Sequence, residues 1–344
     1  MCRLAPPDRR EVVLPAYTCY SVAASVVKAG LTPRLVDIDP ETLDFDHDEL
    51  GRTDFRRVLA IVATNLYGLP NDLPALSSLA GRHGVFLIDD AAQAMGASIG
   101  GRPCGSWGDA GLFSFDKGKN VSAIDGGVVV TNSDAVAGAL RAAMAGLTGP
   151  GAAASAVHVL KALAYFMLLR PSLYGIPTRI PALALGTTAF TTDYPLALAD
   201  PRLVALGLVM MDRLDEFTRA RVATAKALID GLRGASGIQQ IRPAAGARVA
   251  YLRLPILVAR AGERAAMIDA LTAAGIGATA SYPSALVDVP ELRPHLANPD
   301  LRAAGGRAVA ARLITLPTHP FVASHDVERT VAIIQERTQT ACAA

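Results

Sequence analysis

Over its first third the chain alternates short apolar runs with helical segments, and this rhythm constrains the fold more than any other feature. Apolar runs at 11–17, 33–39 and 85–90 are typical of strands, and helical patterns at 21–30 and 72–84 separate them. Strands that are apolar throughout are buried on both faces, as in parallel sheets covered by helices. We therefore expect an α/β fold: a three-layer αβα large domain with a mostly parallel sheet.

The second half of the chain predicts a smaller C-terminal α+β domain, because strand and helix patterns alternate there after a long helical stretch. That stretch, 200–234, is apolar on one side and charged on the other, and we expect one helix that links the two domains. We place the large domain at 1–200, and the linking helix with the small domain at 201–344. Residues 147–200 lack strand alternation and are interpreted as an insertion in the large domain.

The most apolar later stretch, 159–176, does not predict a membrane span. It contains Lys161, Arg170 and Pro171, and it is shorter than the about 20 apolar residues that cross a bilayer. We interpret it as a core helix, with an interfacial helix as the alternative. The N-terminal segment carries charges where a secretion signal needs an apolar core, so secretion is not supported.

Charge and cysteine content argue against several kinds of partner. The formal net charge is +2 with no basic block, which leaves no electrostatic footprint for nucleic acid. Cys2, Cys19, Cys104 and Cys342 are scattered and form no CxxC pair, so we expect neither a zinc site nor a disulfide framework, and we expect a reducing cytoplasm. The acidic stretch 37–50 lacks the ligand spacing of a calcium loop and is interpreted as a solvated loop that caps a helix. No metal is expected.

Two predicted strand ends carry an acid and an amine. Ligands of open parallel sheets bind at the carboxyl ends of the strands. Asp90 and Gln93 follow one such strand, and Ser114, Lys117 and Lys119 end or follow another. A lysine that forms a Schiff base and an acid that keeps the ring nitrogen protonated are what pyridoxal phosphate requires. Taken singly, such an acid is commonly a helix cap and such a lysine a solvated turn residue.

Residues 88–131 carry a family resemblance. An acidic-Asp-x-Ala-Gln motif is followed by a glycine-rich stretch, by Ser-Phe, by Lys-Asn after three intervening residues, and by Gly-Gly before a strand. This pattern resembles the central signature of the DegT/StrS family of sugar aminotransferases, which are fold-type I enzymes that use pyridoxal 5'-phosphate. Weaker likeness extends through 12–43, 66–76 and 313–320.

The resemblance implies a role for each candidate residue. Lys119 would form the Schiff base with the cofactor and later move a proton between substrate carbon and cofactor. Asp90 would pair with the pyridinium nitrogen, Gln93 would bond the phenolic oxygen of the ring, and Ser114 would contact the phosphate. Lys117 stays a solvated turn residue. A related dehydratase branch has histidine at the position of Lys119, so the lysine favours amino transfer.

The resemblance also implies the reaction and the assembly. It points to transfer of an amino group from an amino acid such as glutamate to a keto group on a nucleotide-linked sugar, in polysaccharide biosynthesis, with the site at a homodimer interface. The family's phosphate-binding "G-[ST]-x-A" loop has no counterpart in this sequence. The alternative is therefore a truncated, catalytically impaired or non-catalytic member that acts as a binding or scaffold protein.

Three further positions leave alternatives open. Cys19 stands where family members often have an aromatic residue that stacks on the cofactor; Tyr17 or Tyr20 could replace it, and strand alternation favours Tyr17. Segment 191–197 replaces the family's N-Y-R segment, which reaches the neighbouring subunit's site. His319 follows a predicted strand and could face substrate or serve as a structural turn residue.

Overall fold

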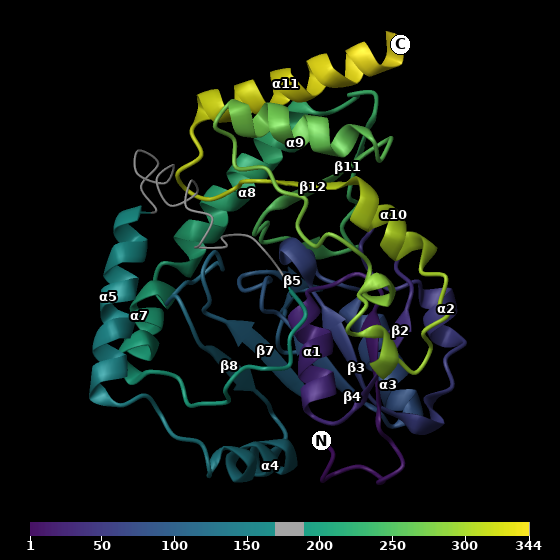
Figure 1. Ribbon diagram of the computed structural model, residues 1–344, viewed down its shortest axis with the longest axis vertical. Coiled ribbons are helices and arrows are strands. Elements are labelled where there is room, and N and C mark those ends of the chain that lie inside the picture. The colour runs from purple at the N-terminus through teal and green to yellow at the C-terminus, as the bar shows by residue number, and fades with distance from the viewer. Residues whose placement is uncertain (169–188, 344) are drawn as a thin grey trace.

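A six-stranded sheet forms the centre of the larger part of the molecule, in a computed structural model that describes residues 1–168 and 189–343 (Figure 1). Its strand order is β2-β1-β3-β4-β7-β8, and only β8 runs antiparallel to its neighbour. The predicted α/β fold with a mostly parallel sheet is thus confirmed. The strands are β1 (Glu11–Pro15), β2 (Thr32–Val36), β3 (Val58–Thr64), β4 (Phe86–Asp90), β7 (Ala110–Ser114) and β8 (Gly127–Val130).

Alternating side chains of β1 show the three layers directly. Val12 and Leu14 belong to one buried cluster, which includes residues of α1, whereas Val13 belongs to another, which includes residues of α3. Because successive strand residues point to opposite faces, the sheet lies between two helical layers. The helices of this part are α1 (Tyr20–Lys28), α2 (His47–Gly51), α3 (Leu73–His83) and α4 (Asp134–Met144), with 3₁₀ turns at Phe55–Arg57 and Leu66–Gly68.

Helix α3 has the ends that its sequence predicts. The carboxylate of Asp72 accepts a hydrogen bond from the Ala75 N–H at 3.1 Å, which satisfies a free backbone donor of the first turn. Gly84 ends the helix in the left-handed conformation, with φ of 57°. Local chemistry alone therefore sets the boundaries of this helix.

The prediction of one long helix over 200–234 is wrong. The stretch forms two helices, α7 (Pro201–Met211) and α8 (Leu214–Gly231) (Figure 1). Arg213, between them, pairs with Glu216 in the first turn of α8 at 2.7 Å. Two acidic residues in that first turn, Asp215 and Glu216, favour a new helix start there, because they complement the positive end of the helix dipole.

Helix α5 (Ala152–Leu168) lies at the surface beside α7, and not in the core as we expected for 159–176 (Figure 1). Leu160 and Met167 are 65% and 66% exposed, while Ala162 is buried. Residues 169–176 of the predicted helix lie outside the described residues. Within the described part of the chain, no helix is long and apolar enough to cross a bilayer.

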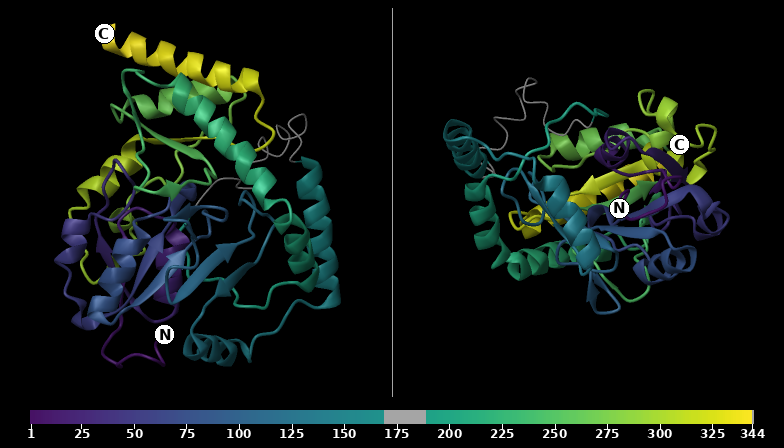
Figure 2. Two further views of the ribbon diagram at one scale, coloured as in Figure 1. Left: turned by 180° about the vertical axis from the view of Figure 1, so that it is seen from behind. Right: turned by 90° about the horizontal axis from the view of Figure 1, so that it is seen from below.

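A three-stranded antiparallel sheet organises the C-terminal part, in the order β12-β11-β9, as the predicted α+β unit requires. Leu228 of α8 and Ile334 of α11 belong to its buried cluster. The two chain ends lie at opposite ends of the molecule (Figures 1 and 2). The elements are β9 (Ile238–Gln240), β11 (Leu254–Val258), α9 (Glu263–Ala273), α10 (Ala304–Arg312), β12 (Leu313–Leu316) and α11 (Ser324–Ala343), with 3₁₀ turns at Leu286–Asp288 and Arg293–His295.

A second small sheet joins the two halves of the chain. Strand β10 (Ala247–Arg248) pairs with β5 (Ser98–Ile99), which pairs with β6 (Arg102–Pro103). The segment just before β11 is therefore bonded to the segment just after β4. The division of the chain at 200/201 stays a prediction.

Gly111 of β7 offers a sharp test of this packing. A Cβ atom added there would lie 1.8 Å from the backbone oxygen of Gly105, so backbone must move. We expect Gly111→Ala to lower the free energy of unfolding by at least the about 1–3 kcal/mol typical of overpacking. The control is Gly81→Ala in α3, where a Cβ meets nothing within 4 Å and alanine should be neutral or stabilising. Urea unfolding measures both; equal stabilities would contradict the close approach.

Candidate functional site

Two adjacent aspartates end β4, and the first of them is locked in place. Asp89 is fully buried, and its carboxylate accepts hydrogen bonds from the side-chain amide of Asn65 at 2.9 Å and from the backbone N–H groups of Gly105 and Trp107 at 2.6 and 3.1 Å. Burial raises the pKa of Asp89, and these donors oppose the rise. Because neighbouring strand residues point to opposite faces, this anchor turns Asp90 to the other face.

Asp90 lies within electrostatic reach of Lys119. One carboxylate oxygen of Asp90, Oδ1, accepts the Ala92 N–H at 2.9 Å. Burial raises the pKa of Asp90, whereas the Ala92 amide and the positive charge of Lys119 lower it. The structure therefore brings together the acid and the amine that the sequence assigns to separate strand ends.

Lys119 lies in the turn that connects β7 to β8, and the backbone of this turn is held on both sides. The Tyr165 hydroxyl of α5 accepts the Gly118 N–H at 3.0 Å, and the Asn120 side-chain amide donates to the Met95 carbonyl. Among residues 1–168 and 189–343, the Lys119 amine forms no hydrogen bond or ion pair. The loop is thus fixed, while the amine is left available.

Gln93 is held at both ends of its side chain. Its Oε1 accepts the Tyr67 N–H at 2.9 Å, and its Nε2 donates to the Tyr282 hydroxyl at 2.8 Å. Tyr67 has a φ of 58°, which is costly for a residue with a side chain and is held here by these contacts. A primary amide has two N–H donors, so Nε2 keeps one for a further partner.

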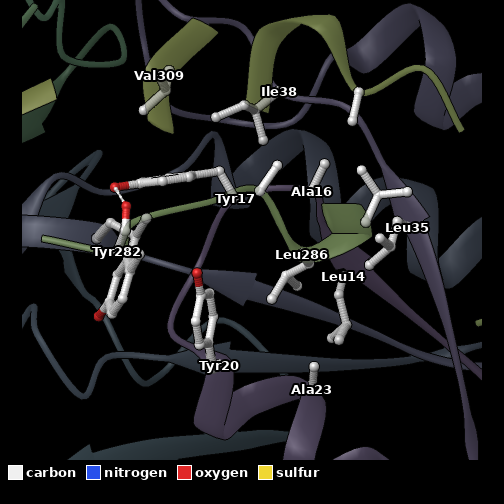
Figure 3. Close-up of a cluster of buried hydrophobic side chains, with 14 of the residues drawn as sticks. Leu14, Ala16, Tyr17, Tyr20, Ala23, Leu35, Ile38, Tyr282, Leu286 and Val309 are labelled. Carbon is white, nitrogen blue, oxygen red and sulfur yellow. Dashed lines mark hydrogen bonds between the residues drawn. The ribbon is translucent and has the colours of Figure 1, made fainter. Parts of the chain in front are cut away.

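Tyr17, the residue favoured for stacking on a cofactor, is fully buried and serves the core. Its hydroxyl donates to the Tyr282 carbonyl at 3.3 Å (Figure 3). The same hydroxyl lies 3.5 Å from the Tyr67 hydroxyl. The Tyr20 hydroxyl bonds the Ser284 hydroxyl at 2.6 Å. Both tyrosines are therefore engaged in packing, and their positions give no support to a stacking role.

Ser114 ends β7 beside the end of β4, because the two strands pair in parallel with Asp90 opposite Leu112. The Ser114 hydroxyl accepts the Asp116 N–H at 3.2 Å and is partly exposed. Lys117 is exposed, as expected for a solvated turn residue. Ser114 thus shares one edge of the sheet with Asp90.

The residues at this edge fit pyridoxal phosphate. Burial raises the pKa of Asp90, and a cation beside it, such as a protonated ring nitrogen, would favour the ionised carboxylate. Lys119 offers an amine without a competing hydrogen bond, and Gln93 has an N–H to spare. These three residues therefore match three groups of the cofactor: Lys119 matches the aldehyde, Asp90 the ring nitrogen and Gln93 the phenolic oxygen.

Sequence reasoning missed Tyr282, which contacts Gln93 directly. Its hydroxyl also interacts with the Cys19 thiol, and burial, followed by the nearby Cys19, raises the pKa of Tyr282. Tyr282 lies on an irregular segment in the second half of the chain, where no periodic pattern marks it. Its position beside Pro283 in a "SYP" turn was the one available signal.

The acidic stretch 37–50 lies at a different place. It lines a cavity of about 840 Å³ together with residues from the C-terminal half. Asp46 caps α2 by accepting the Glu49 N–H at 2.9 Å, as expected for a helix-capping loop. No group of three His, Cys, Asp or Glu in the described ranges could hold a metal ion.

Comparisons with known proteins show which family and which solved structures this chain resembles. The sequence model of the DegT/DnrJ/EryC1/StrS aminotransferase family matches residues 4–157 and 202–335. A pleiotropic regulatory protein of Geobacillus stearothermophilus is 40% identical over 128 residues, which are 37% of this chain and 34% of that protein. A UDP-N-acetyl-3-dehydro-alpha-D-glucosamine 3-aminotransferase of Acidithiobacillus ferrooxidans is 42% identical over 129 residues, 37% of this chain and 34% of that protein.

The fold is that of a solved aminotransferase. The crystal structure of TlmJ from Streptoalloteichus hindustanus superposes with a TM-score of 0.76 and 25% identity, over 97% of this chain and 80% of that one. The matches to the curated relatives span only about a third of the length of those proteins.

Asp90→Asn tests the electrostatics of the site in cofactor-free protein. Because the pKa of Asp90 is raised in the folded state, wild-type stability falls as the pH rises from the ordinary carboxyl pKa through the raised one. The variant loses this dependence, so its stability relative to wild type should increase with pH. Urea unfolding at acid and neutral pH measures the difference. Asp116→Asn, at an exposed carboxyl in the same loop, should show no such trend; a flat difference for Asp90→Asn would contradict the burial argument.

Proposed function

The chain belongs to the DegT/DnrJ/EryC1/StrS aminotransferase family, and from this premise we propose that it is an aminotransferase that uses pyridoxal 5'-phosphate. It moves an amino group from an amino acid such as glutamate to a keto group of a nucleotide-linked sugar. The observation that carries the proposal is that the Lys119 amine lies within electrostatic reach of the buried Asp90 carboxyl at one sheet edge. The name of the Acidithiobacillus relative, which acts on a UDP-linked dehydro sugar, supports the substrate class.

When bound, pyridoxal phosphate supplies an aldehyde that amines attack and a ring that accepts electrons. Lys119 would be the catalytic residue: its Nζ would form the Schiff base with the aldehyde at rest and, once displaced by the donor amine, would move a proton between the substrate carbon and the cofactor in each half-reaction. The Asp90 carboxylate would keep the ring nitrogen protonated. The free N–H of Gln93 would donate to the phenolic oxygen, and the Ser114 hydroxyl would donate to the phosphate.

The surrounding contacts support these roles. The bonds of Gly118 to Tyr165 and of Asn120 to Met95 hold the loop, so that the Lys119 amine moves on a fixed base. Holding two reacting groups in the correct geometry in advance can remove a large part of the activation barrier of the reaction.

We further propose a homodimer in the cytoplasm. Leu160 of α5 and Leu208 of α7 are each 65% exposed on adjacent helices, and an apolar surface of this kind favours burial against another subunit. Cys2, Cys19 and Cys104 are free thiols, as a reducing compartment would keep them. The division into a domain of residues 1–200 and one of residues 201–344 is part of the same proposal.

Lys119→Ala is the direct test of the function. We expect the purified wild type to develop a visible absorbance band with added pyridoxal phosphate, and the variant to lack it, because the amine that the proposal assigns to the covalent link is gone. Amino transfer from glutamate should fall by at least the about 10²–10⁴-fold typical of losing a proton-transfer group. Spectra and a coupled transfer assay measure both effects.

Lys117→Ala is the matched control, because Lys117 is an exposed lysine of the same loop. It should keep both the band and the activity. A wild type that binds no cofactor would instead support the alternative, a family member that acts as a binding or scaffold protein. A band that survives in Lys119→Ala would refute the assignment of the lysine.

A further inference from the structure

The outward face of α5 carries a line of exposed apolar side chains at the spacing of a coiled coil. We call this line the outer stripe: Ala153, Ala156, Leu160, Leu163 and Met167. These residues recur at alternating intervals of three and four, as the a and d positions of a heptad do. Leu160, Leu163 and Met167 are 65%, 56% and 66% exposed. The pattern is typical of a helix that packs lengthwise against another helix.

The opposite face of α5 is already occupied inside the subunit. The Ser155 hydroxyl donates to the carboxylate of Asp200, the residue that caps α7, and the His158 ring lies 3.1 Å from the same carboxylate oxygen. Ala162 shares a buried cluster with Leu203 of α7. These contacts fix the rotation of α5 about its axis, and they leave the outer stripe facing solvent.

The inner face of α5 also contacts the loop that carries Lys119. The Tyr165 hydroxyl accepts the Gly118 N–H at 3.0 Å, directly beside the lysine. Ala162 belongs to the same buried cluster as Ala123, near the end of this loop. Any contact that holds α5 in place therefore also holds the lysine loop.

The charges of α5 favour a second copy of this chain as the partner of the outer stripe. Lys161 is the only Lys, Arg, Asp or Glu from Ala152 to Met167, and it is exposed beside the stripe, at heptad position b. Two identical stripes can thus meet across a two-fold axis without burying a charge. Helices that lie on lipid surfaces instead carry several basic residues on their polar face, and the polar face of α5 is turned to α7.

The apolar area of this surface suits a dimer. Helix α7 lies beside α5 and continues the exposed surface (Figure 1). Together the two helices expose eight large apolar side chains: Val157, Leu160, Leu163, Met167, Val204, Leu208, Val209 and Met211. At about 60 Å² each they offer roughly 500 Å² of apolar surface. A standard interface buries about 800 Å² per partner, of which about 65% is apolar in homodimers, so the two areas agree.

We propose that α5 packs against α5 of a second copy of this chain, and that this contact holds the lysine loop of each subunit. The inference rests on the homodimer of the proposed function; it names the helices in contact and gives the second copy a role at the site. The family model matches residues 4–157 and 202–335, so most of α5 lies outside the matched ranges. The contact therefore belongs to a segment particular to this chain.

The first test measures the oligomeric state of the full chain without cofactor, by sedimentation velocity and light scattering. We expect the wild type to be a dimer. Leu160→Asp should weaken dimerisation at least about 100-fold, because a carboxylate would be buried without a partner in the middle of the contact. Because Leu160 is exposed within the subunit, the variant should fold and melt as a monomer. The control is Lys161→Asp, which introduces the same charge one residue away and off the stripe, and should stay dimeric.

Cross-linking gives a positive readout of the same contact. Leu160 is the middle residue of the outer stripe, so it lies near its own copy whichever way the two helices run. Under mild oxidation Leu160→Cys should form a covalent dimer, because the two thiols come within reach of a disulfide. Lys161→Cys points away from the partner helix and should cross-link no more than the wild type, whose own free thiols set the background.

Trypsin tests the connection to the lysine loop. It cleaves after Lys117 and Lys119, and the monomeric Leu160→Asp should be cut there at least about tenfold faster than the wild type, because proteolysis follows the population of the open loop. Lys161→Asp should be cut in this loop at the wild-type rate. Equal rates in the wild type and a monomeric Leu160→Asp would refute the connection.

The remaining outcomes separate this inference from the proposed function. A Leu160→Asp protein that stays dimeric, or a Leu160→Cys protein that does not cross-link, would place the dimer contact elsewhere and overturn the inference alone. A monomeric wild type that binds phosphatidylserine vesicles through Leu160 would show that the outer stripe meets lipid, and would also overturn it. A failed cofactor spectrum in a protein whose dimer depends on Leu160 would count against the proposed chemistry only.

Discussion

The buried carboxylate of Asp89 is the interaction on which the candidate site depends. It receives three hydrogen bonds, one from Asn65 at the end of β3 and two from the backbone N–H groups of Gly105 and Trp107. These bonds tie the ends of neighbouring strands to one point, and the alternation of the strand then directs Asp90 to the opposite face. Asp90 itself accepts a hydrogen bond from the Ala92 N–H and lies within electrostatic reach of Lys119. Because burial raises the pKa of Asp90, a cationic group of a ligand beside it would favour the ionised carboxylate.

Much of the fold could be predicted from the sequence, because the deciding forces are local. Apolar runs mark the strands of the parallel sheet, and Asp72 and Gly84 mark the ends of α3 through their own hydrogen bonds and backbone conformation. The break between α7 and α8 could not be predicted, because the apolar pattern runs through it and only the turn at Arg213 separates the two helices. The surface position of α5 depends on which elements it meets, and periodicity does not carry that information.

Some residues of the candidate site could also be predicted from the sequence, and others could not. Asp90 and Lys119 could be named because residues at the carboxyl ends of parallel strands meet at one edge, and the family motif identifies them by type and spacing. Tyr282 could not be named, because its role arises from a contact between distant segments: it lies 189 residues from Gln93, its hydrogen-bond partner. Such residues stand in ordinary positions of the sequence and acquire a function only when the C-terminal half folds against the central sheet.

The central claim is that the Lys119 amine and the Asp90 carboxyl serve one cofactor ring. A crystal structure of the protein with pyridoxal phosphate tests it most directly, because it locates both groups relative to the ring. The account predicts continuous density between the Lys119 nitrogen and the cofactor, with the Asp90 carboxylate at the ring nitrogen. A ring joined to another lysine, or an Asp90 carboxylate facing away from the ring, would contradict it.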